Sequence, residues 1–153
     1  AGGNADPLVL IDYAHTPDAL ENALSALRGV AKARGGMLFC IFGCGGNRDA
    51  GKRPQMGEVA ARLADQVMVT TDNPRFEDPL DIIDDIVAGI PEGRHDVCVD
   101  RREAIERIIT RVSARDVVLI AGKGHESYQE VKGIRHDFSD RDVAEKALQR
   151  RRG

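Results

Sequence analysis

The stretch Asp72-Asn73-Pro74-Arg75 places a carboxylate, an amide, a rigid proline and a guanidinium in consecutive positions. The planar fork of Arg75 can hold a carboxylate by two parallel hydrogen bonds, while Asp72 and Asn73 can accept hydrogen bonds from an ammonium. A zwitterionic amino acid needs both kinds of partner. The alternative is a capped turn without ligand, because Asn and Asp favour turns and Pro fixes one dihedral angle.

A second candidate is residues 46–52, which have the spacing GxxxxGK of a phosphate-binding loop. Arg53 follows, where that loop needs a Ser or Thr hydroxyl for magnesium, so a nucleotide triphosphatase loop is disfavoured. Arg48, Lys52 and Arg53 near the start of a predicted helix suit an anion-binding loop. A glycine-rich connection with solvated charges is the alternative.

The stretch Gly122-Lys123-Gly124-His125-Glu126 could also contact a ligand. Its two glycines allow close approach of the backbone, and Glu126 could pair with an amine. His15 lies in a similar loop, but a lone histidine is no evidence for catalysis. The sequence shows no Ser/His/Asp order, paired catalytic carboxylates or metal-ligand cluster, so a non-catalytic module that binds a nucleotide or an anionic metabolite is an alternative.

These loops all follow apolar runs that we predict to be buried strands. The predicted strands are 8–12, 37–42, 66–70, 96–99 and 117–121, and helices are predicted from Pro17 to Gly35, from Pro54, from Pro79 to Pro91, from Arg101, and from Ser139 to about Arg150. Residues 128–131 and 134–138 flank Lys132-Gly133 as a hairpin. The alternation predicts an α/β fold: a three-layer, Rossmann-like, mostly parallel sheet with helices on both faces and a C-terminal hairpin. Ligands of such folds bind beyond the carboxyl ends of the strands, so the polar loops should crowd one rim.

Composition narrows the class of protein. The chain has 153 residues, 42% of them hydrophobic, and a net charge of -3, which suits one globular domain and disfavours a nucleic-acid or membrane-surface binder. Cys40, Cys44 and Cys98 complete neither a disulfide framework nor a zinc site, so we expect a cytoplasmic protein. Residues 1–7 are expected to be a flexible lead-in from a missing central domain, and residues 8–153 to form the domain itself.

Together with Asp12-Tyr13-Ala14-His15-Thr16-Pro17 and Gly43-Cys44-Gly45-Gly46-Asn47-Arg48-Asp49, these motifs resemble the C-terminal domain of Mur ligases, and among them the diaminopimelate-adding branch. The resemblance implies a role in peptidoglycan synthesis, and hence in cell-wall biogenesis, cell shape and cell division. In that family ATP phosphorylates the D-glutamate carboxylate of UDP-N-acetylmuramoyl-dipeptide. An amine of the incoming amino acid then attacks the acyl phosphate, and an amide bond forms.

The resemblance also assigns roles to residues. Arg48 and Arg75 would hold carboxylates of meso-diaminopimelate. Asp72 and Asn73 belong to the loop of Arg75. Gly122 and Glu126 would contact the far amino-acid end of the diaminopimelate side chain. Asp12 and His15 would lie near ATP. The full-length enzyme would use ATP and Mg²⁺, with most Mg²⁺ ligands in the N-terminal and central domains that this chain lacks, so the isolated domain is expected to be inactive. A lysine-adding ligase and a folylpolyglutamate-type ligase are the alternatives within this chemistry.

Overall fold

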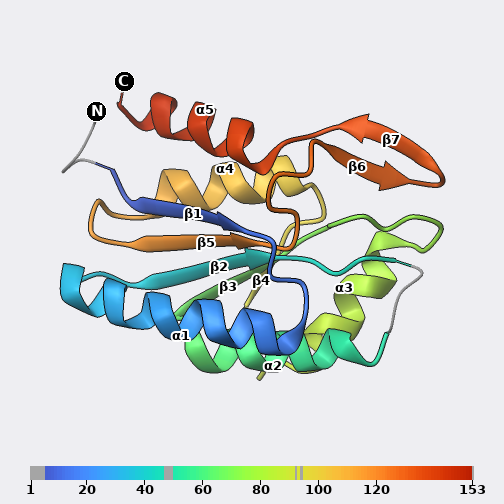
Figure 1. Ribbon diagram of the computed structural model, residues 1–153, viewed down its shortest axis with the longest axis horizontal. Coiled ribbons are helices and arrows are strands. Elements are labelled where there is room, and N and C mark those ends of the chain that lie inside the picture. The colour runs from blue at the N-terminus through green and yellow to red at the C-terminus, as the bar shows by residue number, and fades with distance from the viewer. Residues whose placement is uncertain (1–5, 47–49, 92, 94, 153) are drawn as a thin grey trace.

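The computed structural model describes residues 6–46, 50–91, 93 and 95–152, where strands and helices alternate as expected (Figure 1). The elements are β1 (Leu8–Asp12), α1 (Pro17–Arg34), β2 (Leu38–Phe42), α2 (Lys52–Leu63), β3 (Gln66–Val69), α3 (Pro79–Val87), β4 (Asp96–Val97), α4 (Arg101–Arg111), β5 (Val117–Ala121), β6 (Tyr128–Val131), β7 (Ile134–Asp137) and α5 (Asp140–Arg152). Within these ranges, none of the helices has the length and apolar character that crossing a lipid bilayer requires.

The first five strands form one parallel sheet in the order β1-β5-β2-β3-β4. The two central strands, β2 and β5, are buried along their whole length, which explains their unbroken apolar sequences. β5 lies between β1 and β2, so β1, β5, β2 and β3 are neighbours, and their carboxyl ends meet at one edge. The loops that carry the candidate residues therefore leave the sheet side by side.

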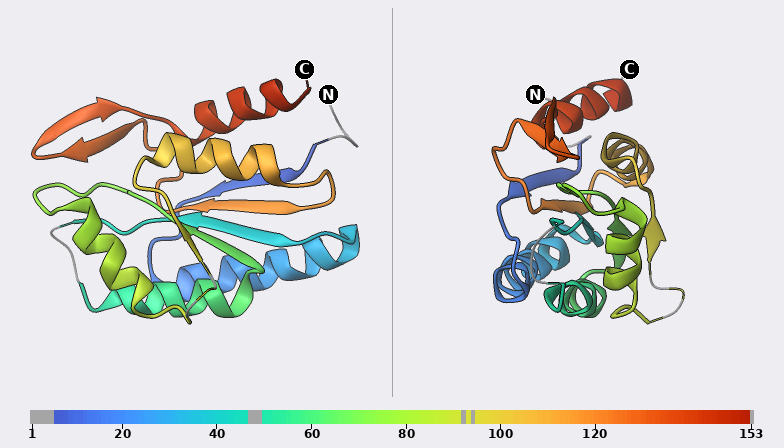
Figure 2. Two further views of the ribbon diagram at one scale, coloured as in Figure 1. Left: turned by 180° about the vertical axis from the view of Figure 1, so that it is seen from behind. Right: turned by 90° about the vertical axis from the view of Figure 1, so that its right-hand side faces the viewer.

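Helices cover both faces of the sheet, as predicted (Figure 2). One core packs α1, α2 and α3 against the sheet through residues such as Leu20, Met56 and Ile83. The other packs α4 and α5 against the opposite face through residues such as Ile105 and Ala144. The three-layer α/β arrangement that the sequence predicted is confirmed.

The predicted start and end of α1 are also confirmed. The Thr16 side chain accepts a hydrogen bond from the Ala19 backbone N–H at 3.2 Å, and Pro17 occupies the first turn, where it lacks only an amide that would have no helical partner. Gly35 ends the helix in the left-handed conformation, with φ of 71°. Local sequence is enough to define these boundaries.

Other boundaries differ from the prediction. At the ends of α3 and β4, backbone groups form hydrogen bonds in a tight turn or with a side chain instead of continuing the helix or strand. The α3 helix ends at Val87 rather than near Pro91, since the chain tightens into a turn in which the Ile90 amide donates to the Val87 carbonyl. The β4 strand stops at Val97 instead of Val99, whose carbonyl accepts from the Thr71 hydroxyl at 2.6 Å. The α2 helix begins at Lys52, ahead of the predicted Pro54.

The hairpin of β6 and β7 is a separate two-stranded antiparallel sheet beyond the carboxyl ends of the main strands (Figure 1). Lys132 and Gly133 turn it with φ angles of 53° and 80°. An isolated parallel bridge between Arg75 and Val131 joins the hairpin to the loop after β3. The hairpin thus supports the loop after β3, which carries the predicted ligand-binding residues Asp72, Asn73 and Arg75.

Candidate functional site

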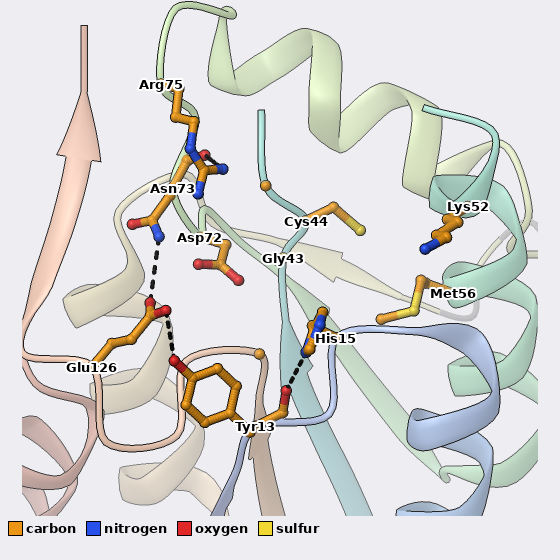
Figure 3. A pocket seen from close by; sticks show the side chains of 12 residues that line it. Tyr13, His15, Gly43, Cys44, Lys52, Met56, Asp72, Asn73, Arg75 and Glu126 are labelled. Atoms are coloured by element: carbon orange, nitrogen blue, oxygen red, sulfur yellow. Dashed lines mark hydrogen bonds between the residues drawn. The ribbon is translucent and has the colours of Figure 1, made fainter. Parts of the chain in front are cut away.

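A cavity of about 400 Å³ lies at the carboxyl edge of the sheet and collects all four predicted loops (Figure 3). Its lining residues come from the loops after β1, β2, β3 and β5 and from the start of α2: Tyr13, His15, Gly43, Cys44, Gly45, Lys52, Met56, Asp72, Asn73, Arg75, Gly122 and Glu126. The expectation that the polar loops share one rim is therefore confirmed. Both charge signs face this one space.

The loop after β3 is pressed against the glycine-rich loop after β2. The Gly46 amide donates to the Asn73 carbonyl at 2.7 Å. A Cβ atom on Gly46 would lie 1.8 Å from the Pro74 carbonyl oxygen, so only glycine fits there. The close contact fixes the distance between the two walls of the cavity.

Asn73 is buried and its side chain joins three other segments. Its Oδ1 accepts from the Lys123 ammonium at 2.7 Å and from the Glu130 amide at 2.9 Å. Its Nδ2 donates to the Glu126 carboxylate at 3.4 Å. Because Oδ1 already receives two hydrogen bonds from the protein, the carboxylates of Asp72 and Glu126 are better placed than Asn73 to accept from a ligand ammonium.

Arg75 is held in an unusual backbone conformation, with φ of 54°. Its amide donates to the Glu130 carbonyl at 3.0 Å and its carbonyl accepts from the Lys132 amide at 2.6 Å, so the hairpin grips the residue from both sides. The guanidinium donates to the Gly46 carbonyl at 3.0 Å and lies 3.7 Å from the Glu130 carboxylate. Because the ion pair to Glu130 is long, the guanidinium can still take a carboxylate partner from the cavity.

Glu126 lies at another wall of the cavity, and the Tyr13 hydroxyl donates to its Oε2 at 3.0 Å (Figure 3). That hydrogen bond, followed by the charge of the carboxylate, raises the pKa of Tyr13 above its ordinary value. Tyr13 therefore stays a neutral donor at physiological pH and keeps Glu126 oriented.

The buried centre of the site is Lys123, whose side chain is completely inaccessible to solvent. Its ammonium lies 3.2 Å from Asp72 Oδ1 and 3.5 Å from Glu126 Oε1, besides its hydrogen bonds to Asn73 and to the Tyr128 carbonyl. In this structure the loop after β3 thus binds the ammonium of Lys123.

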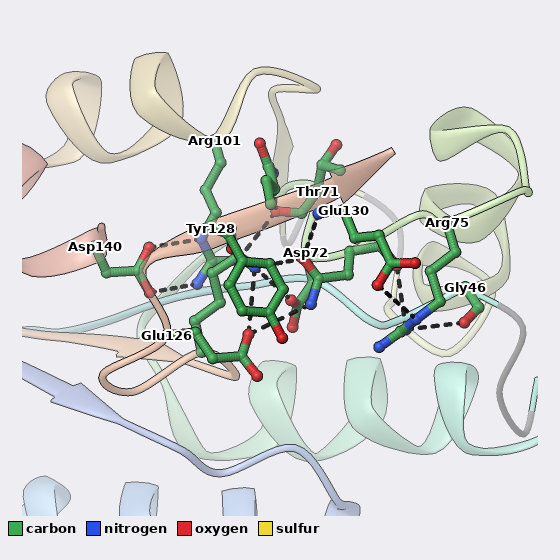
Figure 4. Close-up of polar contacts among 12 residues, drawn as sticks. Gly46, Thr71, Asp72, Arg75, Arg101, Glu126, Tyr128, Glu130 and Asp140 are labelled. Atoms are coloured by element: carbon green, nitrogen blue, oxygen red, sulfur yellow. Dashed lines mark hydrogen bonds and ion pairs between the residues drawn. The ribbon is translucent and has the colours of Figure 1, made fainter. Parts of the chain in front are cut away.

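Behind the loops, Arg101 forms a fully buried ion pair with Asp140 (Figure 4). Both bonds to the carboxylate measure 2.7 Å, and the guanidinium also donates to the carbonyls of Thr71 and Ala121, each at 3.1 Å. These two carbonyls mark the ends of the strands that lead into the site. Arg101 therefore fixes the loops after β3 and β5 to each other.

Of the two candidate residues that follow or end β1, His15 lines the cavity and Asp12 does not. His15 lines the cavity, and its Nδ1 lies 2.8 Å from the Tyr13 carbonyl, which can only accept, so Nδ1 carries the proton. In the neutral ring Nε2 then remains an acceptor. Asp12 is exposed at the end of β1, outside the set of lining residues, and accepts from the Ala14 amide at 3.3 Å.

The anion-binding interpretation of residues 46–53 is not supported for Arg53. This side chain is 2% exposed and pairs with Glu77 at 2.7 Å and Asp85 at 2.9 Å, so its charge is neutralised inside the protein. Lys52 does line the cavity and is exposed. Arg48 lies outside the described residues.

The cysteines and acidic side chains supply no reactive or metal centre in the part of the chain that the structure covers. Cys44 lines the cavity, but burial raises the pKa of its thiol to about 12, so it is not a thiolate nucleophile at neutral pH. Cys40 and Cys98 are buried free thiols. The described residues contain no group of three or more His, Cys, Asp or Glu side chains arranged to hold a metal ion.

Sequence reasoning missed Lys123, Tyr13, Glu130 and Arg101. Lys123 and Tyr13 both lie inside motifs that the sequence singled out, yet nothing in the local pattern shows that one side chain turns inward and the other bonds across the cavity. Glu130 and Arg101 lie in a predicted strand and helix, where a charged residue normally faces solvent. Their roles depend on contacts between segments far apart in the sequence.

Comparison with known proteins finds relatives of this chain. The family model described as "Mur ligase, glutamate ligase domain" matches residues 2–124. UDP-N-acetylmuramoyl-L-alanyl-D-glutamate–2,6-diaminopimelate ligases are similar to nearly the whole chain. The sequence from Acidovorax sp. (strain JS42) is 60% identical over 148 residues, and that from Pseudomonas putida is 58% identical over 148 residues, each over 96% of this chain. The chain spans about 30% of the length of these curated relatives.

Solved structures of ligases are also similar to this chain. A UDP-N-acetylmuramoyl-L-alanyl-D-glutamate–2,6-diaminopimelate ligase superposes with a TM-score of 0.87 and 45% identity over 95% of this chain and 30% of its own. A murein peptide ligase from Psychrobacter arcticus gives a TM-score of 0.62 at 21% identity, over 95% of this chain and 28% of its own. At that lower identity the likeness concerns the fold alone.

Proposed function

This chain belongs to the Mur ligase family as a glutamate ligase domain, and from that premise we propose that it is the amino-acid-binding domain of an ATP-dependent ligase. The proposed whole enzyme adds meso-diaminopimelate to UDP-N-acetylmuramoyl-L-alanyl-D-glutamate in peptidoglycan synthesis, and forms an amide bond. The names and high identity of its relatives support this reading. The proposal includes a cytoplasmic location.

The observation that carries the proposal is a cavity that offers a guanidinium and two carboxylates to one ligand. Arg75 faces it from one wall, and Asp72 and Glu126 face it from others. Diaminopimelate carries two carboxylates and two amino groups, so it can use both kinds of partner. Arg48, which lies outside the described residues, is proposed to hold a further carboxylate, and Asn73 and the Gly122 backbone complete the contacts.

Arg75 also supports diaminopimelate over lysine. Lysine lacks the second carboxylate, so the half-buried guanidinium would gain no carboxylate from the ligand beside its long pairing to Glu130. A site built for a charged group rejects a ligand without that group much more strongly than it rejects a ligand of slightly different size. A lysine-adding or folylpolyglutamate-type ligase is therefore a less supported alternative.

ATP and Mg²⁺ enter the proposal through the rest of the ligase. Asp12 and His15 lie on the β1 side of the site, where they are proposed to face the nucleotide when the domains close. The Mg²⁺ ligands are proposed to lie mostly elsewhere in the enzyme. ATP would supply the activated carboxyl group, and this chain would deliver and orient the amine that attacks it, so its contribution is mainly positioning.

The test is an amino-acid panel assayed with the full-length protein, ATP and the UDP-linked dipeptide. We expect kcat/KM for meso-diaminopimelate to exceed that for L-lysine by roughly a hundredfold or more. A reaction without the UDP-linked dipeptide is the control and should release no ADP. Comparable use of lysine would contradict the assigned substrate, and a protein that binds nucleotide but ligates no amino acid would support the non-catalytic alternative.

A further inference from the structure

Lys123 is a buried cation that the proposed binding function does not yet use. Its side chain is fully inaccessible, and three oxygen atoms lie close to its ammonium: Asn73 Oδ1 at 2.7 Å, the Tyr128 carbonyl at 3.0 Å and Asp72 Oδ1 at 3.2 Å. An ammonium has three N–H donors, so these partners satisfy it. Glu126 Oε1 lies just beyond them, at 3.5 Å.

The backbone around Lys123 explains why so long a polar side chain is inside the protein. Gly122 and Gly124 both have positive φ angles, 114° and 55°, which other residues rarely adopt. A Cβ atom on Gly122 would lie 2.7 Å from Asp72 Oδ2. The two glycines therefore let the loop turn sharply around Lys123 and bring it against the loop after β3.

The Lys123 ammonium contacts three of the side chains that line the cavity: Asp72, Asn73 and Glu126. It pairs directly with Asp72 and Glu126, which would otherwise be two like charges around one space. Through Asn73 it also reaches the Glu130 amide, and the next contacts of Glu130 are with Arg75. Because the Lys123 ammonium is buried, it contacts the carboxylates of Asp72 and Glu126 from inside the protein. A ligand can approach the same carboxylates from the cavity.

We propose that Lys123 is the positioning residue of the amino-acid site: its buried ammonium holds Asp72, Asn73 and Glu126 in the arrangement that receives the amino group of the incoming substrate. Since its donors are occupied by the protein, Lys123 itself does not contact the substrate. This inference rests on the proposed function, because it concerns the same cavity.

The test compares Lys123→Met and Lys123→Gln with Lys146→Met in the full-length ligase. Methionine keeps the length of the side chain without charge or donors, while glutamine keeps hydrogen-bond donors without charge. Lys146 is an exposed lysine on α5 and serves as the matched control. KM for diaminopimelate, KM for ATP and kcat are measured at a temperature where thermal unfolding shows each variant to be folded.

For Lys123→Met we expect KM for diaminopimelate to rise by about tenfold or more, the effect of losing a charged hydrogen-bonding partner, with KM for ATP unchanged. Lys123→Gln should fall between this variant and the parent, and Lys146→Met should match the parent. A crystal structure of either folded Lys123 variant should show the Glu126 carboxylate displaced from the Asn73 amide.

An unchanged KM for diaminopimelate in a folded Lys123 variant would overturn the inference. So would a parallel rise of both KM values, since that is the result of general disorder rather than of a misplaced amino-acid site. Should Lys123→Met fail to fold, Lys123→Gln carries the same comparison. If the parent enzyme itself ligates no diaminopimelate, the proposed function fails, which is a separate and recognisable result.

Discussion

At the scale of single residues, Asn73 shows how one amide can hold a site together. Its oxygen receives hydrogen bonds from Lys123 and from the Glu130 backbone, and its nitrogen donates to Glu126. The partners come from the loop after β5 and from the hairpin. Asn73 thus acts on the geometry of the site as well as facing its cavity.

The variant Asn73→Ala should lower the free energy of unfolding by about 2–3 kcal/mol, because it leaves a buried ammonium and a backbone amide with fewer acceptors. Urea unfolding of the chain, followed by circular dichroism, measures this. Asn22→Ala, at an exposed position in α1, is the control and should change stability little. If Asn73→Ala were as stable as the parent, the bonds to Lys123 and Glu130 would contribute nothing to the fold.

The sequence predicted which loops meet at the cavity better than it predicted the contacts of their side chains. Asp72, Asn73, Arg75, Gly122, Glu126 and His15 all line the observed cavity, because loops after neighbouring parallel strands meet at one edge of the sheet. Their partners could not be predicted. Lys123 turns inward between Gly122 and Gly124, which take positive φ angles, and Arg53 pairs with Glu77 and Asp85 from another part of the chain.

At the scale of elements, the buried pair of Arg101 and Asp140 joins the start of α4 to the start of α5. The same guanidinium bonds the carbonyls of Thr71 and Ala121, at the ends of β3 and β5. Burying two charges is favourable only if both are fully paired, as they are here. This pair therefore couples the helix layer to the loops of the site.

Removing one member of that pair should be costly. We expect Arg101→Met and Asp140→Leu each to lower the free energy of unfolding by about 3–5 kcal/mol, because each leaves an unpaired buried charge. The double variant should lose less than the sum of the two. Denaturant titrations of all four proteins give the coupling energy, and strictly additive losses would show that the two side chains do not act as a pair.

The order of the elements was predictable and some of their ends were not. Apolar runs and helix caps such as Thr16 are local signals, so β1, α1, α4 and β5 match the prediction closely. The ends of α3 and β4 depend on a tightened last turn and on the Thr71 hydroxyl bonded to the Val99 carbonyl. Such contacts cannot be recognised in the local sequence.

At the scale of the whole molecule, this chain is one part of the proposed reaction. It spans about 30% of the length of its relatives, and its cavity is lined by side chains of both charge signs. In the proposal, this chain holds the amino acid whose amine attacks, and the remainder of the ligase holds the activated carboxyl group. The two groups meet only when the two parts of the enzyme close.

The 153-residue chain alone should therefore not turn over ATP. A coupled assay of ADP release, with the full-length ligase as the positive control, checks this under the same conditions. Steady release by the fragment, at a rate that follows its concentration and persists after further purification, would mean that the chain holds catalytic groups of its own.

The most direct test of the central claim, that this cavity selects diaminopimelate, is the KM for diaminopimelate of the full-length ligase with Arg75→Ala. The exposed Arg141→Ala on α5 is the matched control. Loss of a charged, bidentate partner should raise KM for diaminopimelate by about tenfold to a hundredfold and leave KM for ATP and the control unaffected. A KM for diaminopimelate equal to that of the parent would contradict the account.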